Sequence, residues 1–150
     1  MEIIQIDRNN LGRIKPLWEK LNCLHRDRSE YFSDHFERFT FEKRIEEFAL
    51  KPALGIFAAA KEEKLFAYCI ASIDEHGIGE IDSLYVSKDC RGQRVGQRLM
   101  EKTLVWLDKE GAKKIRISVA QGNEQAFGFY EKFGFKPRFS VLEQVKPEKS

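Results

Sequence analysis

The first forty residues carry one strand-like segment and one helix-like segment. Residues 3–6 (Ile-Ile-Gln-Ile) carry three β-branched apolar side chains, and they predict a short first strand. Apolar side chains then recur every three or four positions from Leu11 to Leu24, the period of one helix face. Pro16 lies inside this pattern, so we expect the helix to kink or to begin near it. Residues 25–39 mix charged and aromatic side chains, and their pattern predicts neither a helix nor a strand.

The middle of the chain predicts a helix followed by a run of strands. Thr40 is a suitable N-cap, and Pro52 ends the helical pattern. The apolar face of this helix is Phe41, Ile45 and Phe48. Three apolar segments with short polar connections come next: 56–60, 65–73 and 80–86. Because the connections are so short, we expect these strands to pair antiparallel.

The last third of the chain returns to helical spacing. Gly111 closes a helix with a clear apolar face, made of Val95, Leu99, Leu104 and Leu107. Three short elements are predicted after it: a strand at 114–119, a helix at 123–132 that Gly134 caps, and a last strand that includes Phe135, Phe139 and Val141.

The order of these elements predicts the fold class. We expect one α/β (α+β) domain over residues 1–150, of which 143–150 form a polar C-terminal tail. The central sheet should be mixed and rich in antiparallel pairs, with helices on both faces. Of the 150 residues 42% are hydrophobic, which suffices for one core and not for two.

Composition excludes several classes of protein. The chain has 26 Lys and Arg against 24 Asp and Glu, so it lacks the basic excess of a nucleic-acid-binding protein. Its longest apolar run has seven residues, too short to cross a membrane. No basic region precedes an apolar stretch at the start, so we expect no secretory signal. These features predict a soluble cytoplasmic protein without a nucleic-acid or membrane partner.

Several common chemistries lack their motifs. The three cysteines are scattered without a C-x-x-C, and the three histidines show no ligand spacing, so we expect no metal site. No phosphate-binding loop of the nucleotide triphosphatases and no esterase nucleophile elbow occurs. Residues 77–82 begin like a dinucleotide-binding loop, but the third glycine is missing and a strand follows.

The connection between residues 80–86 and the helix at Val95 has the features of an anion site. Helix N-terminal amides lack partners inside the helix, and the helix dipole favours negative charge there. Gly92 and Gly96 let the backbone approach a phosphate, and Arg91 adds a forked donor. Residues 88–116 hold nine Lys and Arg against four acids, which suits a polyanion. An ordinary strand-loop-helix connection with solvated arginines is the alternative.

Two motifs here resemble the GNAT superfamily of acyl-CoA N-acyltransferases. Residues 91–96 (Arg-Gly-Gln-Arg-Val-Gly) resemble its coenzyme A loop, Arg/Gln-x-x-Gly-x-Gly/Ala, although Arg94 replaces the middle glycine. Residues 123–135 are similar to its N-x-x-A-x-x-F-Y-x-x-x-G-F signature. The resemblance covers residues 80–135 well, and the N-terminal half only by the order of its elements.

The resemblance implies acetyl-CoA as co-substrate and a set of residues that bind it. Neighbouring parallel strands at 80–86 and 114–119 would splay apart to admit the coenzyme. The residues implied to contact it are Leu84, Tyr85 and Val86 at the pantetheine arm; Arg91, Gly92, Gln93, Arg94, Val95, Gly96 and Gln97 at the pyrophosphate; and Asn123 and Tyr130.

The reaction implied is the attack of an amine on the thioester within one ternary complex. Tyr130 would protonate the departing sulfur; its alternative role is a core aromatic among neighbouring phenylalanines. Glu80 and Asp82 are candidate bases, since alternate strand positions share one face at about 7 Å spacing. The alternative to a catalytic role is that both carboxylates lie at the exposed end of the strand or cap a turn. For Cys90 we expect an ordinary buried or loop thiol.

The identity of the amine that accepts the acyl group is the part of the function that the sequence determines least. Residues 25–39 usually border it in this fold class, and one interpretation is that their acids attract a cationic amine and that Tyr31 and Phe32 pack against it. These acids are Asp27, Glu30, Asp34 and Glu37. A solvated face with a few anchoring aromatic side chains is the alternative, and the one favoured for any single residue. Peptide N-termini, polyamines, aminoglycosides and small metabolites all stay open, as does a homodimer. A non-catalytic acyl-CoA-binding or regulatory module is the alternative function.

Overall fold

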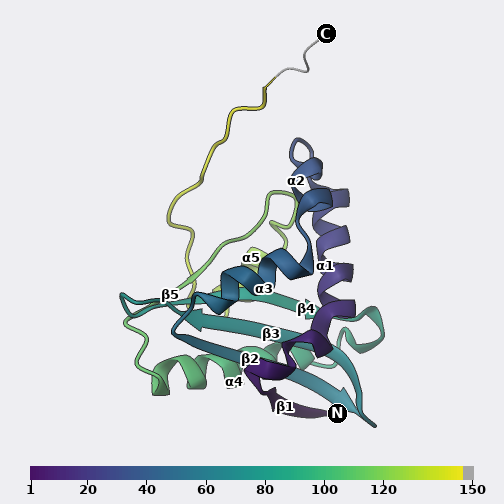
Figure 1. Cartoon of the computed structure of the whole chain (residues 1–150), viewed down its shortest axis with the longest axis vertical. Helices are drawn as coiled ribbons and strands as arrows, with labels where there is room; N and C mark the ends of the chain where they lie inside the picture. The colour runs from purple at the N-terminus through teal and green to yellow at the C-terminus, as the bar shows by residue number, and fades with distance from the viewer. Residues whose placement is uncertain (147–150) are drawn as a thin grey trace.

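A five-stranded sheet forms the centre of the computed structural model, which describes residues 1–146 (Figure 1). Its strands follow chain order from edge to edge: β1 (Glu2–Ile6), β2 (Ala53–Lys61), β3 (Lys64–Ile73), β4 (Ile78–Val86) and β5 (Lys114–Ile117). The pairs from β1 to β4 are antiparallel, and β4 and β5 are parallel. The predicted mixed, antiparallel-rich sheet is confirmed.

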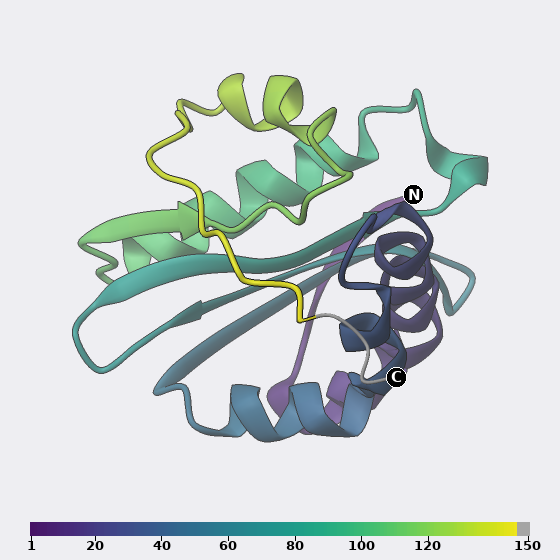
Figure 2. The same cartoon turned by 90° about the horizontal axis from the view of Figure 1, so that it is seen from above.

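Helices cover both faces of this sheet, as the view from above shows (Figure 2). On one face lie α1 (Lys15–Arg28), α2 (Ser33–Arg38) and α3 (Phe41–Ala49), preceded by the 3-10 segment η1 (Arg8–Ile14). On the other lie α4 (Val95–Lys109), which follows the short η2 (Lys88–Cys90), and α5 (Ala126–Glu131). Within the described residues, none of these helices has the length and apolar character that a bilayer crossing requires.

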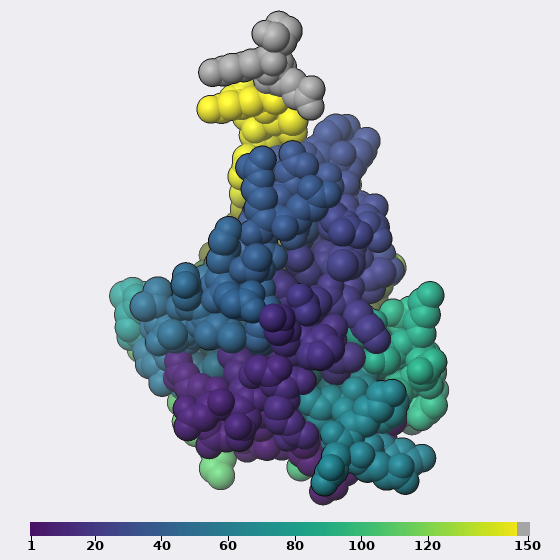
Figure 3. All heavy atoms as spheres, turned by 45° about the vertical axis from the view of Figure 1, so that its right-hand side comes forward, coloured from purple at the N-terminus to yellow at the C-terminus, as the bar shows by residue number. Residues whose placement is uncertain are grey.

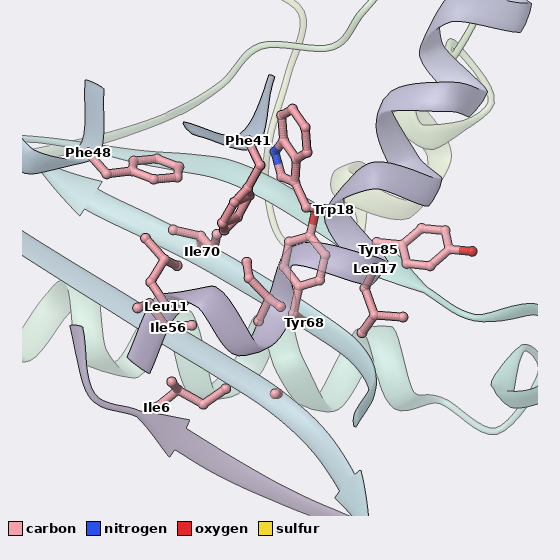
Figure 4. Close-up of a cluster of buried hydrophobic side chains, with 12 residues drawn as sticks. Ile6, Leu11, Leu17, Trp18, Phe41, Phe48, Ile56, Tyr68, Ile70 and Tyr85 are labelled. Carbon is pink, nitrogen blue, oxygen red and sulfur yellow. The ribbon is translucent and has the colours of Figure 1, made fainter. Parts of the chain in front are cut away.

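An aromatic core joins α1 and α3 to the sheet (Figure 4). The ring centroids of Trp18 and Phe41 lie 5.5 Å apart in an edge-to-face arrangement, the geometry that aromatic pairs prefer. Tyr68 of β3 is fully buried beneath them, and its hydroxyl lies 2.7 Å from the Ser83 hydroxyl of β4. This core fixes the position of α1 relative to the middle of the sheet.

A second core lies under α4 on the opposite face. Leu99, Met100 and Leu107 of α4 are fully buried against β2 and β3. Aromatic side chains of α5, among them Phe129 and Tyr130, pack against the edge of this cluster. The sheet is therefore held between two separate apolar layers.

The pairing of β4 changes halfway along the strand. Its ladder with β5 ends at the pair Ile81 and Ile117, and β4 continues to Val86 with β3 alone. The ladder with β3 shifts at Asp82, which has no partner because Ile81 and Ser83 oppose consecutive β3 residues. A bulge of this kind is common beside active sites, where it re-aims a side chain. The splayed strand pair expected from the resemblance is thus present.

Several element boundaries agree with the sequence pattern. The helix around Pro16 begins at Lys15, so the proline lies in its first turn, where its missing N–H costs nothing. Thr40 is the N-cap of α3, and its hydroxyl accepts a hydrogen bond from the Lys43 amide. Ile45, in contrast, lies exposed rather than on the buried face of α3.

The predicted last strand is wrong. Residues 135–146 form no helix or strand, and Phe139 and Val141 are 72% and 83% exposed. A strand needs a hydrogen-bonded neighbour, and this segment runs away from the sheet (Figure 1). Of the predicted tail at 143–150, residues 147–150 lie outside the described part of the chain.

Two neighbouring elements are shorter than predicted. The strand predicted at 114–119 ends at Ile117, because its partner β4 diverges there. The helix predicted at 123–132 covers only Ala126–Glu131. Residues before it form tight turns instead, in which the Ala126 amide donates to the Asn123 carbonyl.

The cap of α3 gives a test of the fold. Replacing Thr40 by Ala removes the hydroxyl that accepts from the Lys43 amide, and we expect a loss of about 1 kcal/mol in the free energy of unfolding. Thr40→Ser keeps the hydroxyl and should cost less than half of that. Urea unfolding followed by circular dichroism measures both. Equal losses in the two variants would show that the cap bond contributes little.

Candidate functional site

A cavity of about 370 Å³ opens at the point where β4 and β5 diverge. Its walls come from α1, α2, α3, both strands, the segment after β5 and α5. Its lining includes the side chains of Trp18, His25, Phe36, Phe39, Arg44, Asp82, Leu84, Asn123 and Tyr130. The cavity therefore brings residues of the predicted site together with residues of the N-terminal helices.

Asp82 lies at the bulge of β4, and its side chain is only 3% exposed. The Ser72 hydroxyl of β3 donates to its Oδ2 at 2.6 Å. Arg44 of α3 approaches from the other side, with Nη2 3.8 Å from Oδ1 and 3.1 Å from the Asp82 carbonyl oxygen. A buried carboxylate needs such partners, because desolvation strongly disfavours its charge.

Burial also raises the pKa of Asp82, to about 7, and the charge of nearby Glu80 adds to this effect. The Ser72 hydrogen bond and the charges of Arg44 and Lys51 act in the opposite direction. A carboxyl with a pKa near 7 can take and release a proton at neutral pH, as a general base must. Asp82 lines the cavity and Glu80 does not, which separates the two predicted bases.

Tyr130 of α5 also lines the cavity, from the side opposite α1 and α2. Its ring packs edge-on against Phe129 at 5.4 Å between centroids, and it is half-buried. Burial, together with the charge of Cys69, raises the pKa of Tyr130 to about 12. The phenol therefore keeps its proton over the whole neutral range and can donate a hydrogen bond.

The loop before α4 has the backbone geometry of an anion site. Gly92 and Arg94 both have positive φ, at 82° and 59°. Arg94 occupies a left-handed position that normally favours glycine, and this is the position where the family motif has glycine. No side chain caps α4, and no acid lies in its first turn, so its first amides are free for an anion.

The predicted contacts along β4 lie on its free edge. Leu84 and Val86 face the core under α4, while Tyr85 is buried in the core under α1. Their backbone groups pair with β3 on one side only, because β5 has already ended. An extended ligand could add to this edge as a further strand does.

Asn123 connects the cavity to the end of α1. Its Oδ1 accepts hydrogen bonds from Arg28 Nη1 and from Gln125 Nε2, both at 3.0 Å. The preceding Gly122 has a φ of 95°, and a Cβ there would lie 2.4 Å from the Arg28 carbonyl oxygen. Only glycine therefore permits this close approach of the post-β5 segment to α1.

The structure places the expected acceptor segment differently from the prediction. The four acids at positions 27, 30, 34 and 37 do not line the cavity. Tyr31 and Phe32 line a separate hollow, which α2 shares with residues 143–146. The space-filling view shows the C-terminal segment (yellow) next to these N-terminal helices (Figure 3). Trp18, Phe36 and Phe39 are the aromatic side chains that this part of the chain contributes to the cavity, together with the rings of His25 and His35. Trp18 follows the spacing of core residues, and Phe36 and Phe39 lie in the segment for which the sequence predicted neither helix nor strand.

The sequence carried no functional signal for two residues of the site, Arg44 and Ser72, and it predicted a structural role for a third residue, Cys90. Arg44 gave no signal, because a charged side chain on a helix is usually solvated. Ser72 is a polar residue inside the apolar run of β3, and a polar side chain in such a buried strand indicates a polar partner nearby. Cys90 is buried in the core under α4, as expected for a structural thiol. Within residues 1–146 no three His, Cys, Asp or Glu side chains group as metal ligands do.

Comparison with known proteins gives the same picture. Residues 20–135 match the family model described as the acetyltransferase (GNAT) family. The chain is 29% identical to the peptidyl-lysine N-acetyltransferase YjaB of Salmonella typhimurium over 121 residues, which cover 79% of this chain and 76% of that protein. It is also 29% identical to an uncharacterized N-acetyltransferase of Methanocaldococcus jannaschii, over 46% of this chain and 30% of the archaeal protein.

A solved structure shares the fold. The PaiA N-acetyltransferase from Thermoplasma acidophilum, in complex with coenzyme A, superposes with a TM-score of 0.71 over 94% of each chain. Their sequences are 19% identical, so this likeness concerns the fold alone. The family match covers most of the chain, including β4, the loop before α4 and α5. The chain belongs to the GNAT family of acetyltransferases.

Proposed function

We propose that this protein transfers an acetyl group from acetyl-CoA to an amine by direct attack within a ternary complex. The observation that carries the proposal is the cavity at the divergence of β4 and β5, which both Asp82 and Tyr130 line. One side chain has a pKa suited to taking a proton, and the other keeps a proton to donate. Peptidyl-lysine acetylation by a relative agrees with an amine acceptor.

The coenzyme would bind along β4 and the loop before α4. Its pantetheine arm would pair with the free backbone edge at Leu84, Tyr85 and Val86. Its pyrophosphate would lie against the uncapped amides that begin α4, within the segment from Arg91 to Gln97. Asn123 would contact the coenzyme near the cavity. The positive φ values of this loop fit a backbone wrapped around a phosphate.

Asp82 would remove the proton from the bound ammonium, directly or through a water. The freed amine nitrogen then attacks the thioester carbon, and the C–N bond forms as the carbonyl electrons move to oxygen. When this tetrahedral intermediate collapses, the C–S bond breaks and the electron pair leaves with sulfur. The second proton of the nitrogen is released, and one proton is gained by the thiolate.

Tyr130 would stabilise the departing thiolate chiefly as a hydrogen-bond donor. An unperturbed thiol has a pKa near 8.5. The pKa of Tyr130 is about 12, so complete proton transfer from the phenol to the thiolate is uphill. A hydrogen bond to the developing charge needs no complete transfer, and charge-assisted hydrogen bonds are the strong ones. Thiol formation is completed by a proton from the reacting nitrogen or from solvent.

Thiol release from acetyl-CoA across a panel of primary amines tests the whole proposal. We expect coenzyme A to bind in calorimetry and acetyl-CoA to release thiol in an amine-dependent manner. Tight coenzyme binding without turnover on any amine would instead favour a non-catalytic acyl-CoA-binding module. Absence of coenzyme binding would contradict the assignment of both the loop and the β4 edge.

Removal of the Tyr130 hydroxyl is expected to lower kcat by about 10²-fold, at the lower end for a group that assists proton transfer. The affinity for coenzyme A should stay within about twofold, because the ring and its packing are kept. Steady-state kinetics and calorimetry on Tyr130→Phe measure both values. Tyr31→Phe removes an exposed hydroxyl outside the cavity and should change neither. Full turnover by Tyr130→Phe would remove the residue from the mechanism.

The raised pKa of Asp82 predicts how kcat/KM depends on pH. Because the base must be ionised, kcat/KM should rise with pH through about 7 and then level off. Asp82→Asn should lose this limb together with about 10²-fold or more of the activity. Glu80→Gln should keep the limb but move it to lower pH, because the Glu80 charge raises the pKa of Asp82. An unchanged limb in Asp82→Asn would place the base elsewhere.

A further inference from the structure

The wall of the cavity that α1 and α2 contribute is made of aromatic rings. Trp18 and Phe39 lie 5.9 Å apart between centroids, and Phe39 stacks on His35 at 5.6 Å with an angle of 14°. Phe36 packs against His35 at 5.1 Å and against His25 at 5.5 Å. The rings thus hold one another in place and present a continuous, preformed surface to whatever enters.

The cavity offers almost no negative charge. Asp82 is its one carboxylate among the described residues, and the one guanidinium that lines it, Arg44, lies 3.8 Å from Asp82 Oδ1. The four acids between positions 27 and 37 lie outside the cavity. A single ammonium is matched by Asp82, whereas a second ammonium would find no second carboxylate, only the weaker attraction of ring faces and the repulsion of Arg44.

His25 strengthens this conclusion. Burial and the charge of Arg28 lower the pKa of His25, so its imidazole is neutral at neutral pH, and the same Arg28 charge would repel an ammonium bound beside the ring. Its Nδ1 is buried and has no hydrogen-bond partner among the described residues. A buried polar atom without a partner is costly, and a neutral polar group of a ligand would satisfy it.

We infer that the acceptor is a primary monoamine carried on an apolar stem, and not a polyamine or an aminoglycoside. This inference rests on the proposed function and deepens it by naming the class of acceptor. The ammonium would lie near Asp82, and the stem would pack on the rings of Trp18, Phe36 and Phe39. A free alkylamine and a lysine side chain share this chemistry.

Two linear amines of equal length provide the direct test. Hexylamine and hexane-1,6-diamine differ only in a second ammonium at the far end of the stem. We expect kcat/KM for hexylamine to exceed that for the diamine by about tenfold or more. We also expect kcat/KM to rise roughly fourfold per methylene from propylamine to hexylamine, as each methylene leaves water. A short peptide with one internal lysine distinguishes a peptide-borne stem from a free amine.

The outcomes separate this inference from the proposed function. Equal or better turnover of the diamine, spermidine or kanamycin would overturn the inference while supporting acetyl transfer to amines. Absence of thiol release with every amine, despite coenzyme binding, would overturn the proposed function itself. Turnover of hexylamine or of the lysine peptide well above the polycations supports both.

A charge placed on the ring wall tests the same point in the protein. Phe36→Asp should bring the hexylamine-to-diamine ratio of kcat/KM down by at least tenfold, because the new carboxylate can pair with the second ammonium. Phe36→Leu keeps an apolar wall and should leave the preference for hexylamine in place. Tyr31→Asp adds the same charge outside the cavity and should leave the ratio unchanged. An unchanged ratio in folded Phe36→Asp would contradict the assigned location of the stem.

Discussion

The pairing of β4 on its two edges is the constraint on which the site depends. One edge is bonded to β3 along nearly its whole length, while the other is bonded to β5 only as far as Ile81. Beyond that pair no described strand bonds to this edge of β4 beside the cavity, and in the proposed function the coenzyme pairs with the backbone there. The site therefore lies where the hydrogen-bond ladder between β4 and β5 ends, with one apolar core on each face of the sheet.

The same strand carries a carboxylate, Asp82, whose charge is disfavoured by burial. Asp82 lies at a bulge, almost fully buried, with one hydroxyl and one guanidinium as its close partners. Burial disfavours its charged form, and the raised pKa is the measure of that cost. In the proposed mechanism this burial gives the carboxyl the pKa of a base that works at neutral pH, so one residue would lower stability and serve the reaction.

Arg44 shows how the N-terminal helices contribute to chemistry on β4. It lies over the ring of Phe48, 4.5 Å from its centroid, while one of its amino groups reaches the Asp82 carbonyl and the other pairs with Glu47. Because Phe48 is buried in the core under α3, the guanidinium is held by packing on this ring as well as by its ion pair with Glu47. The orientation of α3 is thereby transmitted to Asp82.

The sequence by itself determined the elements whose signals are local. Sequence patterns placed all five strands, the last of them two residues too long, as well as the long helices. Thr40 and Gly111 marked helix ends, and two motifs identified the family. Only the tertiary structure decided that β5 ends early, that the segment after Phe135 forms no strand, and that Arg44 and Ser72 meet at Asp82. The physical reason is that strand pairing, burial and charge compensation depend on residues far apart in the chain. Local patterns record what a segment prefers, whereas its partners decide what it does.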